Sequence, residues 1–115
     1  MAELSPDELH PAQFYAKKLI GDLQPADGLV QLTGYARNKN ANDDFYLDDT
    51  TGQIQAQNIP EESPQITEGN LYRVFGKYEI DGTGTPIITA HIVQDMQNLE
   101  FDLFLKTMKK WKELP

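Results

Sequence analysis

The sequence predicts an all-β domain with flanking helices, in which a small five-stranded barrel is followed by one C-terminal amphipathic helix. Three observations predict this architecture. Apolar residues alternate with a period of two in five short segments between residues 29 and 93. Turn-forming residues separate these segments. After residue 94 the apolar period changes to 3.6, which indicates a helix.

The bulk composition limits the protein to a few classes. Its 115 residues suit one domain, and its net charge of -8 argues against a chain that binds phosphates over its whole surface. One local basic patch stays compatible with that charge. The absence of cysteine excludes disulfides and thiolate metal sites. Without a secretory signal or an apolar run of roughly 18 residues, we expect a soluble intracellular protein that does not bind a membrane.

The chain divides into three predicted parts. Residues 1–10 form a flexible N-terminus, residues 11–94 form the barrel domain, and residues 95–115 form a C-terminal assembly helix. A helical lead-in is expected from Pro11 to Ile20, because Gly21 follows as a helix stop.

The five strands are expected at residues 29–37, 45–48, 53–59, 71–78 and 86–93. Their alternation places Val30 and Leu32 inside the barrel, and Ile54 and Ala56 as well. The connection at residues 60–69 contains two prolines, which argue against a long helix there. The longer loops follow the first and fourth strands, the loops that flank the ligand face of an oligonucleotide/oligosaccharide-binding (OB) fold.

The predicted C-terminal helix carries an apolar stripe. A helix of about 14 residues is marginal alone in water, so this stripe must be buried either on its own barrel or in a bundle shared with partner subunits. We favour the shared bundle, since Trp and Phe commonly anchor interfaces. Leu103 lies off the stripe and widens the apolar surface. The expected partner-binding residues are Phe101, Leu103, Phe104, Leu105, Met108 and Trp111.

The fourth strand raises a question, because one of its faces carries an arginine, a phenylalanine and a lysine. Basic grooves with aromatic platforms bind single-stranded nucleic acids. In an OB fold the first and fourth strands are neighbours, so their side chains can share a face. The candidate nucleic-acid-binding residues are Tyr35, Arg37, Lys39, Arg73, Phe75 and Lys77. The alternative is that Phe75 packs under the C-terminal helix or a loop, while the cations solvate the rim.

The remaining polar motifs indicate no enzyme. The pairs Asp43-Asp44 and Asp48-Asp49 lack the spacing of a calcium loop and are assigned turn and solvation roles. The Gly82–Gly84 stretch lacks the Gly-Lys-Ser/Thr end of a phosphate loop. No serine, histidine and aspartate set has a nucleophile context. We therefore expect no catalytic residues, no metal and no cofactor.

Three stretches carry a family resemblance. Residues 30–36, 45–54 and 72–77 read VQLTGYA, FYLDDTTGQI and YRVFGK, and in this order they resemble the OB-fold subunits of replication protein A. The tail at residues 100–105, EFDLFL, is similar to the start of the trimerisation helix of the small subunit. The resemblance covers roughly residues 12–112.

The resemblance implies a small OB subunit of a replication protein A-like heterotrimer that binds single-stranded DNA. Its partners would be the middle and large subunits, joined through a bundle of C-terminal helices in the nucleus. Telomeric paralogues share this plan, so a telomere- or telomerase-specific subunit stays open. So do a stand-alone weak single-strand binder and a protein-only adaptor.

Overall fold

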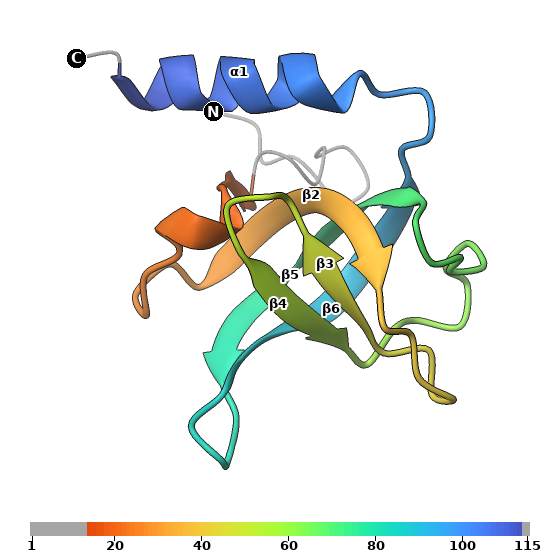
Figure 1. The fold of residues 1–115 in the computed structure, drawn as a ribbon. Coiled ribbons are helices and arrows are strands. Elements are labelled where there is room, and N and C mark those ends of the chain that lie inside the picture. Colours follow the sequence, from red (N-terminus) through yellow and green to blue (C-terminus); the bar gives the residue numbers. More distant parts are fainter. Residues whose placement is uncertain (1–13, 114–115) are drawn as a thin grey trace, which may run out of the picture.

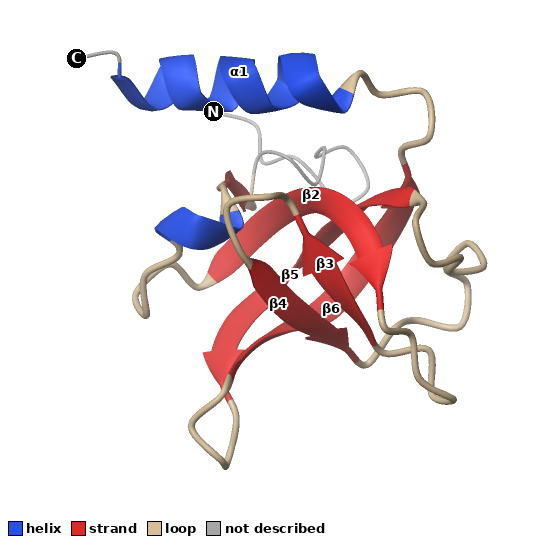
Figure 2. Ribbon diagram, in the orientation of Figure 1, coloured by secondary structure: helices blue, strands red, loops and turns tan. Residues whose placement is uncertain are grey.

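A closed five-stranded barrel with one C-terminal helix forms the protein, as predicted (Figure 1). The computed structural model describes residues 14–113. The sheet has the order β1-β2-β3-β4-β6-β5, and an additional β2–β5 pairing closes it. Figure 2 shows that strands dominate, with the long helix outside the barrel. The elements are β1 (Ala16–Lys17), the 3₁₀ turn η3 (Ile20–Asp22), β2 (Leu29–Arg37), β3 (Phe45–Asp48), β4 (Gln53–Gln57), β5 (Leu71–Ile80), β6 (Pro86–Asp95) and α1 (Phe101–Glu113).

The barrel core is built from the inward positions of these strands. Val30 and Leu32 of β2 are fully buried. So is Ala56 of β4, and Ile54 is nearly so, as the alternation predicts. The connection at residues 58–70 contains no helix, as predicted for residues 60–69. Tyr72 attaches this connection to the core. Its hydroxyl donates a hydrogen bond to the carbonyl of Gln65 (3.0 Å) and accepts one from the amide of Thr67 (2.8 Å). No helix within residues 14–113 is long and apolar enough to cross a membrane.

Two glycines allow the strands to approach closely. A Cβ atom on Gly34 would lie 2.6 Å from the carbonyl oxygen of Asp48, so β2 can cross β3 only without a side chain there. A Cβ atom on Gly76 would overlap the carbonyl oxygen of Thr89 at the point where the β5–β6 register shifts. The glycines that the sequence places in these strands are therefore steric requirements of barrel closure.

The predicted helical lead-in is wrong for residues 14–20, which contain no α-helix. Instead β1 pairs in parallel with β2, with Ala16 opposite Val30. The side-chain amide of Gln31 donates to the carbonyl of Tyr15 (2.8 Å) and fixes the chain beside the sheet. Pairing to a neighbouring strand thus overrides a weak local helix signal. The predicted flexible N-terminus at residues 1–10, and residues 11–13, lie outside the described residues.

Asp49 has a structural role that the sequence analysis missed. Its carboxylate is buried, and it accepts the amide of Ile20 (2.7 Å) and the amide of Thr51 (2.9 Å). The Thr51 hydroxyl in turn accepts the amide of Gly21 (2.9 Å). Asp48 keeps the predicted turn role, accepting the amide of Thr50 (2.8 Å). The solvation role predicted for Asp49 is therefore wrong, because the buried Asp49 carboxylate links η3 to the β3–β4 turn.

Replacing Gly76 by alanine tests barrel closure. We expect Gly76→Ala to lower the free energy of unfolding by about 3 kcal/mol, the upper part of the range for overpacking, because the new methyl group meets backbone and not a flexible side chain. Urea denaturation of the purified chain measures the change. Gly82→Ala is the matched control, since a Cβ there meets nothing within 4 Å. Equal stability of both variants would contradict the steric account.

Candidate interaction surfaces

The six candidate nucleic-acid residues gather on and beside one sheet face. We call Tyr35, Arg37, Lys39, Arg73, Phe75 and Lys77 the outer-face residues. Because β2 and β5 pair antiparallel, Thr33 lies opposite Arg73 and Tyr35 lies opposite Leu71. The outward positions of the two strands thus form one continuous surface, as the predicted topology requires.

The two aromatic members of this set are covered by other parts of the chain. Phe75 is fully buried, and the ring of Tyr15 packs edge-on against it with centroids 5.5 Å apart. The Tyr15 hydroxyl also hydrogen-bonds Nδ1 of His91 (2.9 Å). The ring of Tyr35 lies 4.9 Å from that of Phe101 on α1. A nucleic-acid base could stack on Phe75 only if Tyr15 moved, so the packing alternative describes the monomer.

Three of the four cations in the set have carboxylate neighbours. Lys77 lies 3.6 Å from Glu79, Lys39 lies 3.4 Å from Asp43, and Arg37 lies 3.9 Å from Asp48. The pKa of Glu79 is held below its ordinary value, first by the hydrogen bond that the Thr89 hydroxyl donates (2.6 Å) and then by Lys77. The carboxylate partners of these cations therefore reduce the charge available for a phosphate.

Arg73 differs from the other three cations. Its guanidinium is half-buried and has no carboxylate within 4.0 Å among residues 14–113, with Nε 3.4 Å from the hydroxyl of Thr33. Burial lowers the pKa of Arg73 from its ordinary value, although an arginine stays charged at neutral pH. Arg73 is thus the member of the set that keeps an unneutralised charge.

Tyr46 is a surface residue that the sequence analysis missed. It lies opposite Arg37 on one side and opposite Gln55 on the other, so the three residues form a row across β2, β3 and β4. Phe45 and Leu47 on either side of it are fully buried, which points Tyr46 outward. The alternation of apolar residues in the segment FYLD could have predicted this outward position of Tyr46. The row combines a cation, an aromatic ring and an amide, groups that suit contacts to nucleic-acid bases and phosphates.

The C-terminal helix divides its apolar residues between two environments. Phe101 and Leu105 are buried in a cluster with Leu19 and Leu71 of the barrel, and Phe104 and Met108 pack half-buried beside them. Leu103 and Trp111 are 59% and 74% exposed. The barrel therefore buries one side of the stripe, as the first alternative predicts, and the described residues leave another side exposed. Burial of that exposed side in a bundle with partner subunits stays a prediction.

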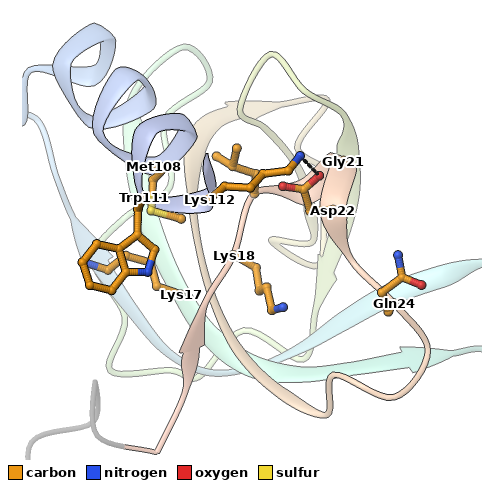
Figure 3. A pocket seen from close by; sticks show the side chains of 9 residues that line it. Lys17, Lys18, Gly21, Asp22, Gln24, Met108, Trp111 and Lys112 are labelled. Atoms are coloured by element: carbon orange, nitrogen blue, oxygen red, sulfur yellow. Dashed lines mark hydrogen bonds and ion pairs between the residues drawn. The ribbon is translucent and has the colours of Figure 1, made fainter. Parts of the chain in front are cut away.

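A groove lies between the C-terminal half of α1 and the chain at residues 17–24 (Figure 3). Its volume is about 470 Å³. Lys112 bridges it through an ion pair with Asp22 (2.9 Å), and Lys18 pairs with Asp27 (3.5 Å). The indole of Trp111 lies beside Lys17 in Figure 3. The lining residues of this α1 groove are Lys17, Lys18, Leu19, Gly21, Asp22, Gln24, Met108, Trp111 and Lys112.

Metal ligands do not gather in the described part of the chain. Residues 14–113 contain no group of three or more His, Cys, Asp or Glu side chains that could hold a metal ion. The surfaces that could contact another molecule are the α1 groove, the exposed side of α1 and the outer face of the barrel.

Comparison with known proteins identifies similar folds. No protein-family model matches the sequence, and no curated protein matches it significantly. Telomere capping protein Ten1 from Saccharomyces pombe is similar in structure, with a TM-score of 0.69 and 10% identity over 87% of this chain and 99% of that chain. A chain of the S. pombe Stn1–Ten1 complex has a TM-score of 0.68 and 10% identity, over 88% of this chain and 94% of that chain. A chain of a replication protein A heterotrimer bound to single-stranded DNA has a TM-score of 0.56 and 20% identity, over 70% of this chain and 67% of that chain. These likenesses show an OB fold.

The two environments of α1 predict different effects of alanine substitution. We expect Leu105→Ala to reduce the free energy of unfolding by about 3 kcal/mol, because it removes a buried side chain that docks the helix. Trp111→Ala should change it by less than about 0.5 kcal/mol, because the indole is exposed. Urea denaturation followed by circular dichroism measures both. A large loss for Trp111→Ala would show that the indole packs on the barrel.

Proposed function

We propose that the protein is a small, non-enzymatic OB subunit of a telomere-type complex that binds single-stranded DNA in the nucleus. Its main role is to hold a larger subunit through α1. The observation that carries the proposal is the exposure of Leu103 and Trp111 on a helix whose other side is already docked. The Ten1 likeness supports the telomeric reading over the general replication trimer, because it extends over 87% of this chain and 99% of that one. The likeness to the replication protein A chain extends over only 70% of this chain and 67% of that one.

Helical spacing places the exposed apolar residues on one side of α1. Leu103, Thr107 and Trp111 follow at i, i+4 and i+8, and all three are exposed. We call these three residues the α1 seam. The half-buried ring of Phe104 borders the seam, stacked on Phe101 with centroids 5.8 Å apart. An exposed tryptophan in such a row is typical of an interface anchor.

Docking on the barrel prepares α1 for a partner. A 13-residue helix alone in water is marginal, but Phe101 and Leu105 hold this one in place. A partner that binds the α1 seam therefore does not have to order the helix, and less of the binding free energy is lost. Such a pre-ordered helix favours the role of an assembly subunit.

The barrel itself has a minor role in binding DNA in this proposal. At physiological salt, Arg37, Lys39, Arg73 and Lys77 contact the DNA strand only within the complex, where the larger subunits supply most of the affinity. The carboxylate neighbours of three of them support a weak contribution. The row of Arg37, Tyr46 and Gln55 is where a strand would meet an aromatic ring.

The double variant Leu103→Glu and Trp111→Glu tests assembly. We expect it to lose the larger subunit in co-purification from native extract, because two charges are placed in an apolar contact. Its circular dichroism should match the parent, since both side chains are exposed. Asp102→Ala is the matched control, because Asp102 is exposed and lies on another side of α1. Retention of the same partner by the double variant would contradict the proposal. Phe104→Glu is less informative, since Phe104 also packs on the barrel cluster.

Binding of a fluorescent oligonucleotide to the isolated chain separates an assembly subunit from a stand-alone binder. We expect weak binding at low salt, lost near physiological salt, because few free cations are available. Fluorescence anisotropy over a salt series gives the affinity and its salt slope. Arg73→Ala should abolish the residual binding, and Lys109→Ala is the control cation away from the outer face. Tight binding at physiological salt would establish the stand-alone reading instead.

A further inference from the structure

Lysines border the α1 seam on both sides. Lys17 of β1 lies next to Trp111, in a hollow that Thr107 and Met108 complete. Lys106 and Lys110 follow each other at i and i+4 on the outer side of the helix, next to Leu103 and Thr107 in the helical spacing. The seam, with the apolar side chains Leu103 and Trp111 on either side of Thr107, therefore lies between two basic edges in a chain whose net charge is -8.

These bordering lysines form no ion pair with the carboxylates whose side chains the structure describes, those of residues 14–112. Lys17, Lys106 and Lys110 are absent from the ion pairs of the described chain, whereas Lys18 and Lys112 are paired with Asp27 and Asp22. Charges that flank an apolar helical seam select the partner, because opposite charges attract across the seam and like charges repel. These lysines therefore favour a partner that carries acidic residues beside the seam.

We infer that the occupant of the α1 seam is a helix of a different chain, with an apolar stripe bordered by glutamate or aspartate on both sides. This inference rests on the proposed function and names the chemistry of its partner. One apolar side chain of that helix enters the hollow formed by Lys17, Thr107, Met108 and Trp111. Its acidic residues pair with Lys17 on one edge and with Lys106 and Lys110 on the other.

The same charges disfavour two other occupants. A second copy packed seam to seam would place Lys106 and Lys110 against their own kind, which is destabilising. A nucleic-acid strand in the α1 groove would meet the carboxylate of Asp22, and two lysines, Lys18 and Lys112, that Asp27 and Asp22 already neutralise. An acidic helix on the seam avoids both conflicts.

Photo-crosslinking at the centre of the seam identifies the occupant. Benzoylphenylalanine at the exposed position Thr107 is irradiated in native extract, and the crosslinked segment is sequenced by mass spectrometry. We expect one segment of another protein, with apolar residues at helical spacing and acidic residues beside them. A crosslink to nucleic acid, to a second copy, or to a neutral or basic segment overturns the inference, as does the absence of a specific crosslink.

Charge reversal then tests the edges separately from the seam. The triple variant Lys17→Glu, Lys106→Glu and Lys110→Glu should bind the identified segment at least about tenfold more weakly. Binding of the parent should weaken as salt rises from about 0.1 M to about 1 M, where the Debye length falls from about 10 Å to about 3 Å. Reversing the segment's acidic residues to lysine should restore affinity for the triple variant. Loss of binding by the Leu103→Glu and Trp111→Glu variant, with no effect of the triple variant, would overturn the inference and leave the proposed function intact.

Discussion

The structure depends on β2 being hydrogen-bonded along both of its edges. β2 pairs with β5 from Leu29 to Tyr35 and with β3 from Tyr35 to Arg37, so one nine-residue strand serves both halves of the barrel. This double pairing removes the free sheet edge and encloses the core. It also bends the sheet so sharply that Gly34 and Gly76 must lack side chains. The outer positions of β2 consequently lie beside those of both β3 and β5, which creates the surface that carries Arg37, Tyr46 and Arg73.

The helix α1 combines internal packing with an exposed side, through which we propose that it binds a partner. Phe101 and Leu105 attach it to Leu19 and Leu71, while the α1 seam stays on a different side of the same helix. A small barrel has little interior to offer, so a second apolar side on its helix is available for another chain. The position of the seam is therefore fixed by the packing of α1 on the core, and the exposed side of the helix is as rigid as that packing.

The sequence predicted the regular parts of this architecture well. Period-two alternation located the five barrel strands, and period-3.6 alternation located α1, because both patterns are local consequences of one buried side. The sequence could not decide the features that depend on contacts between distant segments. The burial of Asp49 depends on the amide of Ile20, and that of Phe75 depends on the ring of Tyr15. The pairing of Lys77 with Glu79 could have been suspected from its spacing along the strand, and the outward position of Tyr46 was visible in the alternation.

The buried carboxylate of Asp49 makes the floor of the α1 groove part of the barrel. Gly21 and Asp22 line the groove, and the turn that contains them is held by Asp49 and Thr51 from the β3–β4 connection. Motion of that floor is therefore coupled to the β3–β4 turn, which is hydrogen-bonded directly to it. A ligand that tightens the groove would slow amide hydrogen exchange at Thr51, a position it never touches, so the two regions would report on one another as a single thermodynamic unit.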